Sequence, residues 1–137
     1  MCNYNIFTRE NVRVTTPSSE TVSTNFTTLR KEDQKWITDF ENAIYTHIRD
    51  FDLTIERLTG EVQTSTAQIN RNVKRILGMT PKKFINEIRF WEARKLLEEH
   101  DQVSVKSAAY SVGFKSVKNF SRNFKKRFGV YPSELLD

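Results

Sequence analysis

The chain repeats one segment of its own sequence. Residues 65–81 match residues 116–132 when the sequence is shifted by 51 positions. A chain that contains two copies of a small unit is expected to fold as two similar subdomains. Identical residues occur at the pairs Ser65/Ser116, Arg71/Arg122, Asn72/Asn123, Lys74/Lys125, Gly78/Gly129 and Pro81/Pro132. Apolar residues also fall in register, at Ile69/Phe120, Val73/Phe124 and Leu77/Phe128.

Upstream of these segments the shift becomes 50, which pairs Ile55/Val105, Leu58/Ala108 and Val62/Val112. The turn before the second helix is therefore one residue longer in the second copy. Each copy predicts a short helix, a tight turn and a basic helix, with a serine as N-cap and a glycine as stop. This order is typical of a helix-turn-helix unit. The alternative is a plain helical-hairpin repeat, which does not require the second helix of each copy to lack acids.

The remaining apolar spacing also predicts helices. Residues at three- and four-residue steps from Trp36 to Ile48 indicate an amphipathic helix over 33–49. Thr54 and Ser104 are placed to cap the first helix of each copy, and Pro81 suits the first turn of a long helix that ends near Glu99. A last turn follows the final proline. The fold class expected is all-α, with about seven helices.

The domain limits follow from this reading. Residues 1–31, rich in Ser and Thr, are expected to form a linker or mobile tail. Residues 32–137 are expected to form the folded domain, with the first helix-turn-helix at 53–78, a connector helix at 81–99 and the second helix-turn-helix at 103–129.

Composition excludes several classes of function. A single cysteine rules out an intramolecular disulfide and a multi-cysteine zinc site, and we expect neither a metal nor a cofactor. His47 and His100 stand alone, without a nucleophile motif or a glycine-rich phosphate loop, so we do not expect an enzyme. No apolar run is long enough for a membrane helix and no signal peptide is evident, which predicts a cytoplasmic protein without membrane contact.

The net charge of +5 is unevenly distributed. Residues 31–53 carry three basic and six acidic side chains, whereas residues 54–137 carry 16 basic and nine acidic ones. Two windows, 62–83 and 103–130, contain five and seven basic residues and no acid. Such windows suit a polyanionic partner, although a solvated helix face is the alternative for either window taken alone.

Burying the apolar seam of each basic helix exposes side chains suited to reading DNA. Arginine bonds to guanine, Gln and Asn bond to adenine, and small apolar groups touch the thymine methyl. Basic residues near the helix ends, together with the two N-cap serines, are expected to contact phosphates without reading sequence. The predicted base-contacting residues are Ala67, Gln68, Asn70, Arg71, Val117, Lys118, Ser121 and Arg122. The predicted phosphate-contacting residues are Ser65, Lys74, Arg75, Lys82, Lys83, Ser116, Lys125, Lys126 and Arg127.

The residues now resemble a known family. The run Gly113-Phe114-x-Ser116, followed by Phe120-Ser121-Arg122-x-Phe124-Lys125, is specific to the DNA-binding domain of AraC/XylS-type transcription regulators. The first copy and the connector add residues of the same pattern, namely Leu58, Val62, Ser65, Ile69, Arg71, Lys74, Gly78, Thr80, Pro81, Phe84, Ile85, Ile88, Arg89, Ala93, Leu96 and Leu97.

The resemblance implies two homeodomain-like helix-turn-helix subdomains bridged by the connector helix. It also implies that recognition helices 65–77 and 116–128 enter successive major grooves of double-stranded DNA, at the base-contacting positions given above. The implied partners are double-stranded DNA, RNA polymerase and a sensor or receiver domain absent from this chain. The helix over 33–49 after a Ser/Thr-rich segment is similar to the output module of a response regulator or hybrid sensor kinase.

Two departures from the family pattern carry expectations. Gln63 occupies a turn position where glycine is common, which predicts a differently shaped turn. Trp91 occupies a normally polar position on the connector, where it contacts either a missing domain or, as we favour, the helix over 33–49. The alternative function is a helical protein-interaction module that docks a partner through Trp36, Phe40 and Trp91.

Overall fold

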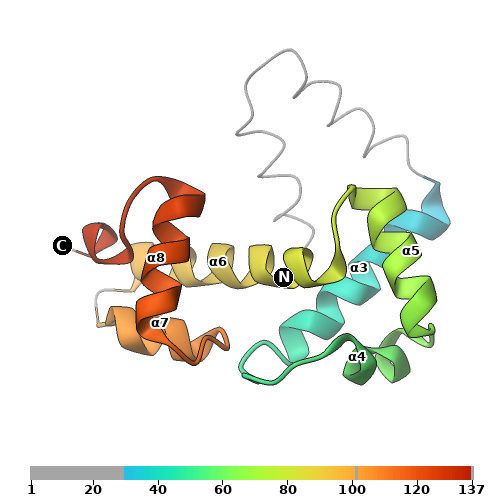
Figure 1. Cartoon of the computed structure of the whole chain (residues 1–137), viewed down its shortest axis with the longest axis horizontal. Helices are drawn as coiled ribbons and strands as arrows, with labels where there is room; N and C mark the ends of the chain where they lie inside the picture. The colour runs from blue at the N-terminus through green and yellow to red at the C-terminus, as the bar shows by residue number, and fades with distance from the viewer. Residues whose placement is uncertain (1–29, 101, 137) are drawn as a thin grey trace, which may run out of the picture. The chain divides into compact units, whose positions relative to one another are not determined.

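The computed structural model describes residues 30–100 and 102–136, and this part of the chain is helical without any strand. The expected all-α class is therefore confirmed. The expected tail over residues 1–31 lies almost entirely outside the described residues. The elements in chain order are α3 (Lys31–Thr46), α4 (Ile55–Val62), α5 (Thr66–Leu77), α6 (Pro81–Glu99), α7 (Val105–Ser111), α8 (Val117–Phe128) and the short 3-10 helix η1 (Pro132–Leu135) (Figure 1).

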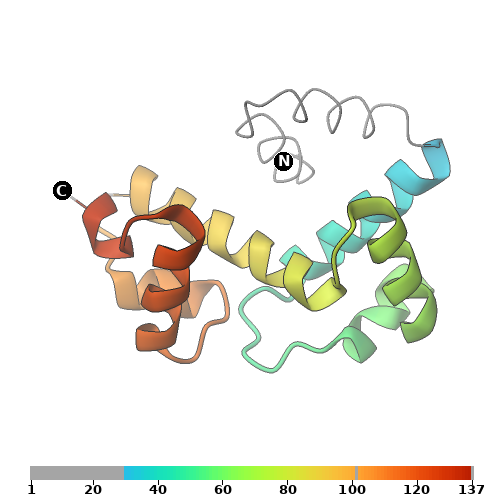
Figure 2. The same ribbon diagram turned by 45° about the horizontal axis from the view of Figure 1, so that its top comes forward.

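The described chain forms two compact units. The first contains α3, α4 and α5; the second contains segment 47–54, almost all of α6, and α7, α8 and η1. Short turns join α4 to α5 and α7 to α8, so each unit contains one helix pair of the repeat (Figure 2). Within the described residues, no helix is long and apolar enough to cross a lipid bilayer.

The first unit has an aliphatic core closed by aromatic rings from α3. Phe40 is fully buried, and Trp36 stacks on it with 5.2 Å between the ring centroids. The indole N–H of Trp36 donates a hydrogen bond to the Thr64 hydroxyl at 3.1 Å, which ties α3 to the turn before α5. Buried aliphatic residues complete this core, namely Ile37, Ile44, Leu58, Ile69 and Val73.

The core of the second unit is aromatic. Phe90 of α6 lies against the rings of Phe114, Phe120, Phe124 and Phe128, with centroid separations between 5.1 and 6.4 Å. Trp91 is only 2% exposed and meets the edge of Phe128 at 5.1 Å. Its ring packs on α8, a neighbour that our expectation did not name, and the expected contact with the helix over 33–49 stays a prediction.

The predicted ends of the two recognition helices are confirmed. Ser65 and Ser116 accept hydrogen bonds from the backbone N–H groups of Gln68 and Asn119, at 3.1 Å in both cases. Gly78 and Gly129 then end α5 and α8 in the left-handed backbone conformation, with φ of 72° and 83°. These caps satisfy backbone groups that a helix end leaves unpaired.

The turns of the two repeats share one backbone feature. Gln63 has a φ of 51°, and Gly113, at the matching position of the second copy, has a φ of 90°. The prediction that Gln63 gives a differently shaped turn is wrong at this dihedral, because a non-glycine residue occupies the same left-handed region. The turns differ in length instead, with two residues between Val62 and Ser65 and three between Val112 and Ser116.

Helix α3 ends earlier than the sequence predicts. It stops at Thr46, because the Asp50 N–H bonds back to the His47 carbonyl at 3.0 Å and closes a turn. Segment 47–54 then joins the second unit, where Arg89 of α6 donates a hydrogen bond to the Asp50 carbonyl at 2.8 Å. Ile48, predicted on the apolar seam of the first helix, is buried in this segment.

Candidate nucleic-acid interface

The predicted base-contacting side chains lie on the solvent-facing sides of α5 and α8. The buried residues of α5 are Ile69, Asn72 and Val73, and those of α8 are Phe120 and Phe124. Each helix thus turns one side to its own core and presents the other to solvent. The predicted base readers Ala67, Asn70, Arg71, Lys118 and Arg122 are exposed, whereas Gln68, Val117 and Ser121 are half-buried.

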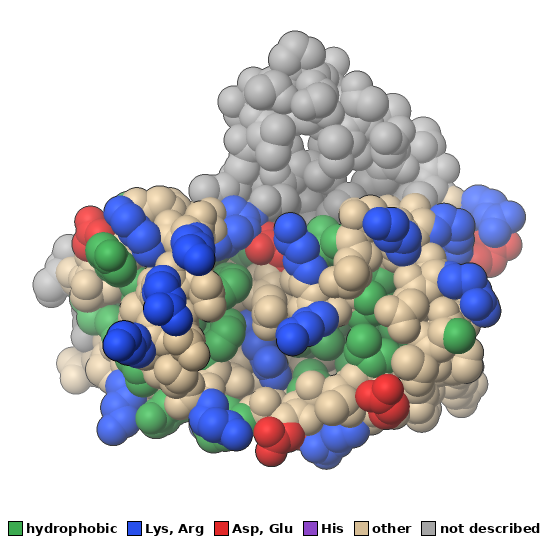
Figure 3. All heavy atoms as spheres, viewed as in Figure 1, with side chains coloured by type: hydrophobic (Ala, Val, Ile, Leu, Met, Phe, Trp, Pro, Cys, Tyr) green, Lys and Arg blue, Asp and Glu red, His purple; other side chains and the backbone are tan. Residues whose placement is uncertain are grey.

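Basic side chains gather along these helices. In Figure 3, Lys and Arg side chains lie along α8 in the second unit and along α5 in the first. Both helices have basic residues in the last turn and no acid in the first. The charge pattern read from the sequence is therefore present on the folded surface.

The same short hydrogen bond recurs in both recognition helices. Arg71 donates from Nη2 to Oε1 of Gln68 at 2.8 Å, and Arg122 donates from Nη2 to Oδ1 of Asn119 at 2.6 Å. The acceptor precedes the arginine by three residues in each case, so the two side chains meet on one helix face. Asn119 was not among our predicted site residues, although the shift of 51 that pairs Arg71 with Arg122 also pairs Gln68 with Asn119.

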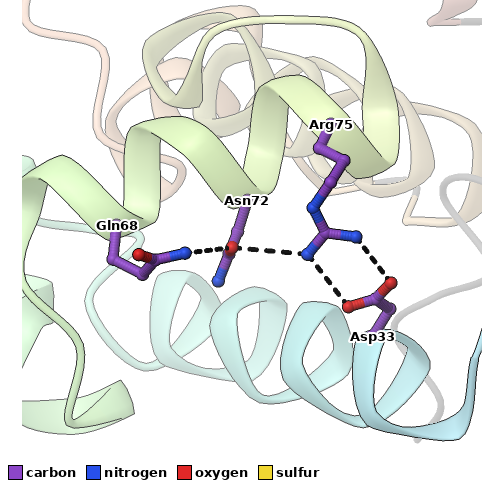
Figure 4. A network of polar contacts seen from close by, with 4 residues as sticks. All are labelled: Asp33, Gln68, Asn72 and Arg75. Atoms are coloured by element: carbon purple, nitrogen blue, oxygen red, sulfur yellow. Dashed lines mark hydrogen bonds and ion pairs between the residues drawn. The ribbon is translucent and has the colours of Figure 1, made fainter.

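In the first unit the chain of polar contacts continues to α3 (Figure 4). Nε2 of Gln68 donates to Oδ1 of Asn72 at 2.7 Å, and that oxygen also accepts a longer bond of 3.4 Å from Arg75. Arg75 in turn binds both carboxylate oxygens of Asp33 on α3, at 2.7 and 3.0 Å. Neither Asp33 nor Asn72 was among the predicted site residues. No local pattern connects Asp33 with Arg75, which lies 42 positions away.

The electrostatics of this ion pair favour its charged form. The hydrogen bond and positive charge of Arg75 lower the pKa of Asp33, against an opposing effect of burial. The same contact raises the pKa of the Arg75 guanidinium. Asp33 is 8% exposed as a whole residue, so the carboxylate depends on its partner for compensation of its charge.

The predicted phosphate-contacting residues fall into two groups. The guanidinium groups of Arg75 and Arg127 are held by acids, since Arg127 binds the two carboxylate oxygens of Glu87 at 2.7 and 2.6 Å. Lys125 donates to the Gly129 carbonyl at 3.1 Å and lies 5.1 Å from the Tyr131 ring centroid. The lysines of the prediction are all exposed, at Lys74, Lys82, Lys83, Lys125 and Lys126.

The alternative function fails on burial. Phe40 has no exposed surface and Trp91 is 2% exposed, so neither ring is available to a partner. Trp36 is half-buried and bonded to Thr64. Over the ranges 30–100 and 102–136, no group of three or more His, Cys, Asp or Glu side chains is arranged to hold a metal ion.

Comparison with known proteins gives concordant matches. Residues 58–137 match the sequence model of a family described as a helix-turn-helix domain. Over 124 residues the chain is 31% identical to a histidine kinase of Formosa agariphila, a match that covers 90% of this chain and 8% of the kinase. Over 67 residues it is 36% identical to the helix-turn-helix-type transcriptional activator RhaS of Pectobacterium carotovorum, covering 49% of this chain and 24% of that protein. It thus spans only a small part of either relative.

A solved structure gives a similar result. The crystal structure of a transcriptional regulator with an AraC-type DNA-binding domain, from Chromobacterium violaceum, superimposes with a TM-score of 0.69 at 26% identity. The superposition covers 77% of this chain and 93% of that one.

Proposed function

This chain belongs to the AraC-type helix-turn-helix family of DNA-binding domains, and we propose that α5 and α8 are two recognition helices that bind specific sequences in double-stranded DNA. Domains of this family bind DNA and are not enzymes. The chain would act as the DNA-binding part of a transcription regulator in the bacterial cytoplasm, with the two helices entering successive major grooves about 34 Å apart along the duplex.

One observation carries the proposal: the same exposed arginine, with the same amide acceptor three residues earlier, recurs on two capped basic helices. Arg71 with Gln68 and Arg122 with Asn119 repeat this arrangement. A solvated charged face has no need to repeat a specific hydrogen bond. An arginine held at the helix surface suits bidentate recognition of guanine, and a neighbouring amide suits adenine.

The structure divides the predicted residues into proposed roles. We keep the predicted base readers and add Asn119 to them. The proposed phosphate contacts are Ser65, Lys74, Lys82, Lys83, Ser116, Lys125 and Lys126. Arg75 and Arg127 are left out of this set, because Asp33 and Glu87 bind their guanidinium groups in bidentate ion pairs.

A selection of binding sites from random duplexes, followed by footprinting, tests the proposal. We expect two half-sites one helical turn apart, both protected by a monomer. The affinity should fall steeply with salt, with a logarithmic slope of roughly −0.9 for each phosphate neutralised. No binding to duplex DNA at low salt, or equal binding to all duplexes, would overturn it.

The proposed regulator is longer than this chain. The match to 8% of a histidine kinase over 90% of the chain supports an output module attached to a sensor or receiver domain. RNA polymerase is the proposed partner of the bound regulator, as the similarity to the transcriptional activator RhaS suggests. An antibody raised against residues 31–136 should detect a protein much larger than 16.1 kDa in the source cells. A band at that mass alone would contradict the longer regulator.

A further inference from the structure

The first recognition helix carries a polar network that reaches the neighbouring helix α3. Its members, in the order in which they are bonded, are Arg71, Gln68, Asn72, Arg75 and Asp33. Figure 4 shows the last four of them. The hydrogen bonds involve Oε1 and Nε2 of Gln68 and Oδ1 of Asn72. The side-chain amide of Gln68 is therefore fixed on both sides, by Arg71 at its oxygen and by Asn72 at its nitrogen.

We propose that Asp33 and Asn72 are positioning residues for DNA recognition, which hold Gln68 and, through it, Arg71 in place for base contact. The inference rests on the proposed function, since it concerns how the first recognition helix reads its site. Neither residue would touch DNA, because Asp33 and Asn72 are 8% and 9% exposed.

The physical basis is the entropy of long side chains. A free glutamine or arginine side chain loses rotamer entropy when it is fixed in one conformation. A side chain already held in place loses less of this freedom on binding, which favours the sequence for which its geometry is correct. The ion pair anchors the far end of the network, because hydrogen bonds between charged groups are stronger than those between neutral ones.

The second copy provides an internal comparison. Arg122 is held by Asn119 as Arg71 is held by Gln68. However, Asn123, the repeat counterpart of Asn72, is exposed rather than buried. The proposed positioning by a buried amide is thus specific to α5. Loosening the network should weaken sequence reading only in the half-site bound by α5.

Three variants and a matched control test the proposal. Asp33→Asn removes the charge but keeps the shape, and Asn72→Leu replaces the buried amide with an apolar group of similar size. Arg75→Lys is the mildest, because it keeps a cation beside Asp33 but loses the planar guanidinium, whose Nη1 and Nη2 bind Asp33 while Nη2 also reaches Asn72. The control is Asp39→Asn, which makes the same change of charge on the same helix at an exposed pair with Lys35.

The readout is discrimination between the preferred duplex and duplexes with one altered base pair. Arg71→Ala and Arg122→Ala identify which base pairs belong to α5 and which to α8. In the three network variants we expect discrimination at the α5 base pairs to fall by about fivefold to tenfold. Three quantities should stay as in the wild type: discrimination at the α8 base pairs, the affinity for random duplexes and the slope of affinity with salt. The control Asp39→Asn should match the wild type in every one of these measurements, including discrimination at the α5 base pairs.

A purely structural role has a different signature. It would lower the affinity for all duplexes together with the melting temperature and leave discrimination unchanged, which would overturn the proposal. If Asp33→Asn fails to fold, the same measurement of discrimination on Arg75→Lys and Asn72→Leu tests the positioning role. A wild-type protein that does not discriminate at all refutes the proposed function itself. A wild type that discriminates, beside network variants that do so equally well, refutes only the positioning role.

Discussion

The Arg127 guanidinium of α8 and the Glu87 carboxylate of α6 form a two-bonded ion pair, with N to O distances of 2.7 and 2.6 Å. Both side chains are largely shielded from solvent, at 25% and 13% exposure. Arg127 also lies 5.0 Å from the Phe128 ring centroid and 5.8 Å from that of Trp91. A residue predicted from the sequence to touch phosphate is therefore built into the second unit, where it links α8 to α6.

This location separates Arg127 from its neighbour Lys126. Arg127→Ala should lower the free energy of unfolding by about 2 kcal/mol, because it leaves the Glu87 carboxylate without its partner. It should leave the salt slope of DNA binding unchanged. Lys126→Ala, the control, should leave stability unchanged and make the slope shallower by about 0.9, the value for one phosphate contact. Urea unfolding and binding titrations at several salt concentrations measure both quantities. A shallower slope for Arg127→Ala at unchanged stability would restore its phosphate role.

Gly113 is required by both its backbone angle and its surroundings. Its φ is 90°, and an added Cβ would overlap the Ile48 carbonyl and lie 2.8 Å from Nη2 of Arg89. Gly113→Ala should therefore cost about 2–4 kcal/mol of stability, from the left-handed strain together with overpacking.

Gly60 is the matched control for this prediction. It lies inside α4 with no atom within 4 Å of an added Cβ. Gly60→Ala should stabilise the protein by about 0.5–1 kcal/mol, because alanine is the better helix former. Thermal melting of both variants checks the pair, and equal melting temperatures would show that the loop holding Ile48 does not pack on Gly113.

Gln63 takes a backbone angle that glycine would adopt more easily. Gln63→Gly should stabilise the first unit by about 0.5–1 kcal/mol. The free energy gained by relieving the left-handed backbone strain should exceed the entropy cost of ordering a more flexible unfolded chain. Chemical denaturation measures this change. A loss of stability on substitution would mean that the Gln63 side chain makes a contribution that outweighs its strain.

The parts of the fold that were predictable are those encoded locally. The caps at Ser65 and Ser116 and the stops at Gly78 and Gly129 follow from residue chemistry within a few positions, and the repeat presents each of them twice. Burial of Phe120 and Phe124 follows from helical periodicity.

The parts that were missed depend on contacts between distant segments. Arg75 reaches Asp33 across 42 positions and Arg127 reaches Glu87 across 40, and a basic residue in an acid-free window gives no sign of which acid it will meet. The packing of Trp91 on Phe128 of α8 was missed for the same reason. The periodicity of α6 predicts that one side is buried, but it does not say which helix covers that side.

The exposed arginine of α8 should read a base. Arg122→Ala should cost about 1–3 kcal/mol on the preferred duplex and relax the preference at one base pair. Lys118→Ala serves as a comparison. Lys118 is a predicted base reader on the same exposed face, but the Asn119 side chain holds Arg122 rather than Lys118. Competition binding against single-base variants measures the effect. An equal loss on every sequence would make Arg122 a phosphate contact.

Glu41 of α3 links stability to pH. It is 2% exposed, and burial raises the pKa of its carboxyl from the ordinary 4.5 to about 9. Within the described part of the chain, its Oε2 atom has no hydrogen-bond partner. Between these two pKa values the folded state keeps the proton that the unfolded state releases, so the free energy of unfolding falls as the pH rises from about 4.5 to 9.

Glu41→Gln should remove this dependence. Relative to wild type, the variant should gain little stability at pH 5 and on the order of 4 kcal/mol at pH 8, because the amide has no proton to lose. Asp33 acts in a separate range: its lowered pKa gives stability that is present at neutral pH and lost only as the pH falls below its ordinary 3.8. Melting temperatures from pH 5 to 9 distinguish the two groups, with Glu32→Gln, an exposed acid on the same helix, as control. Parallel curves for Glu41→Gln and wild type over that range would mean that the Glu41 carboxylate ionises without penalty.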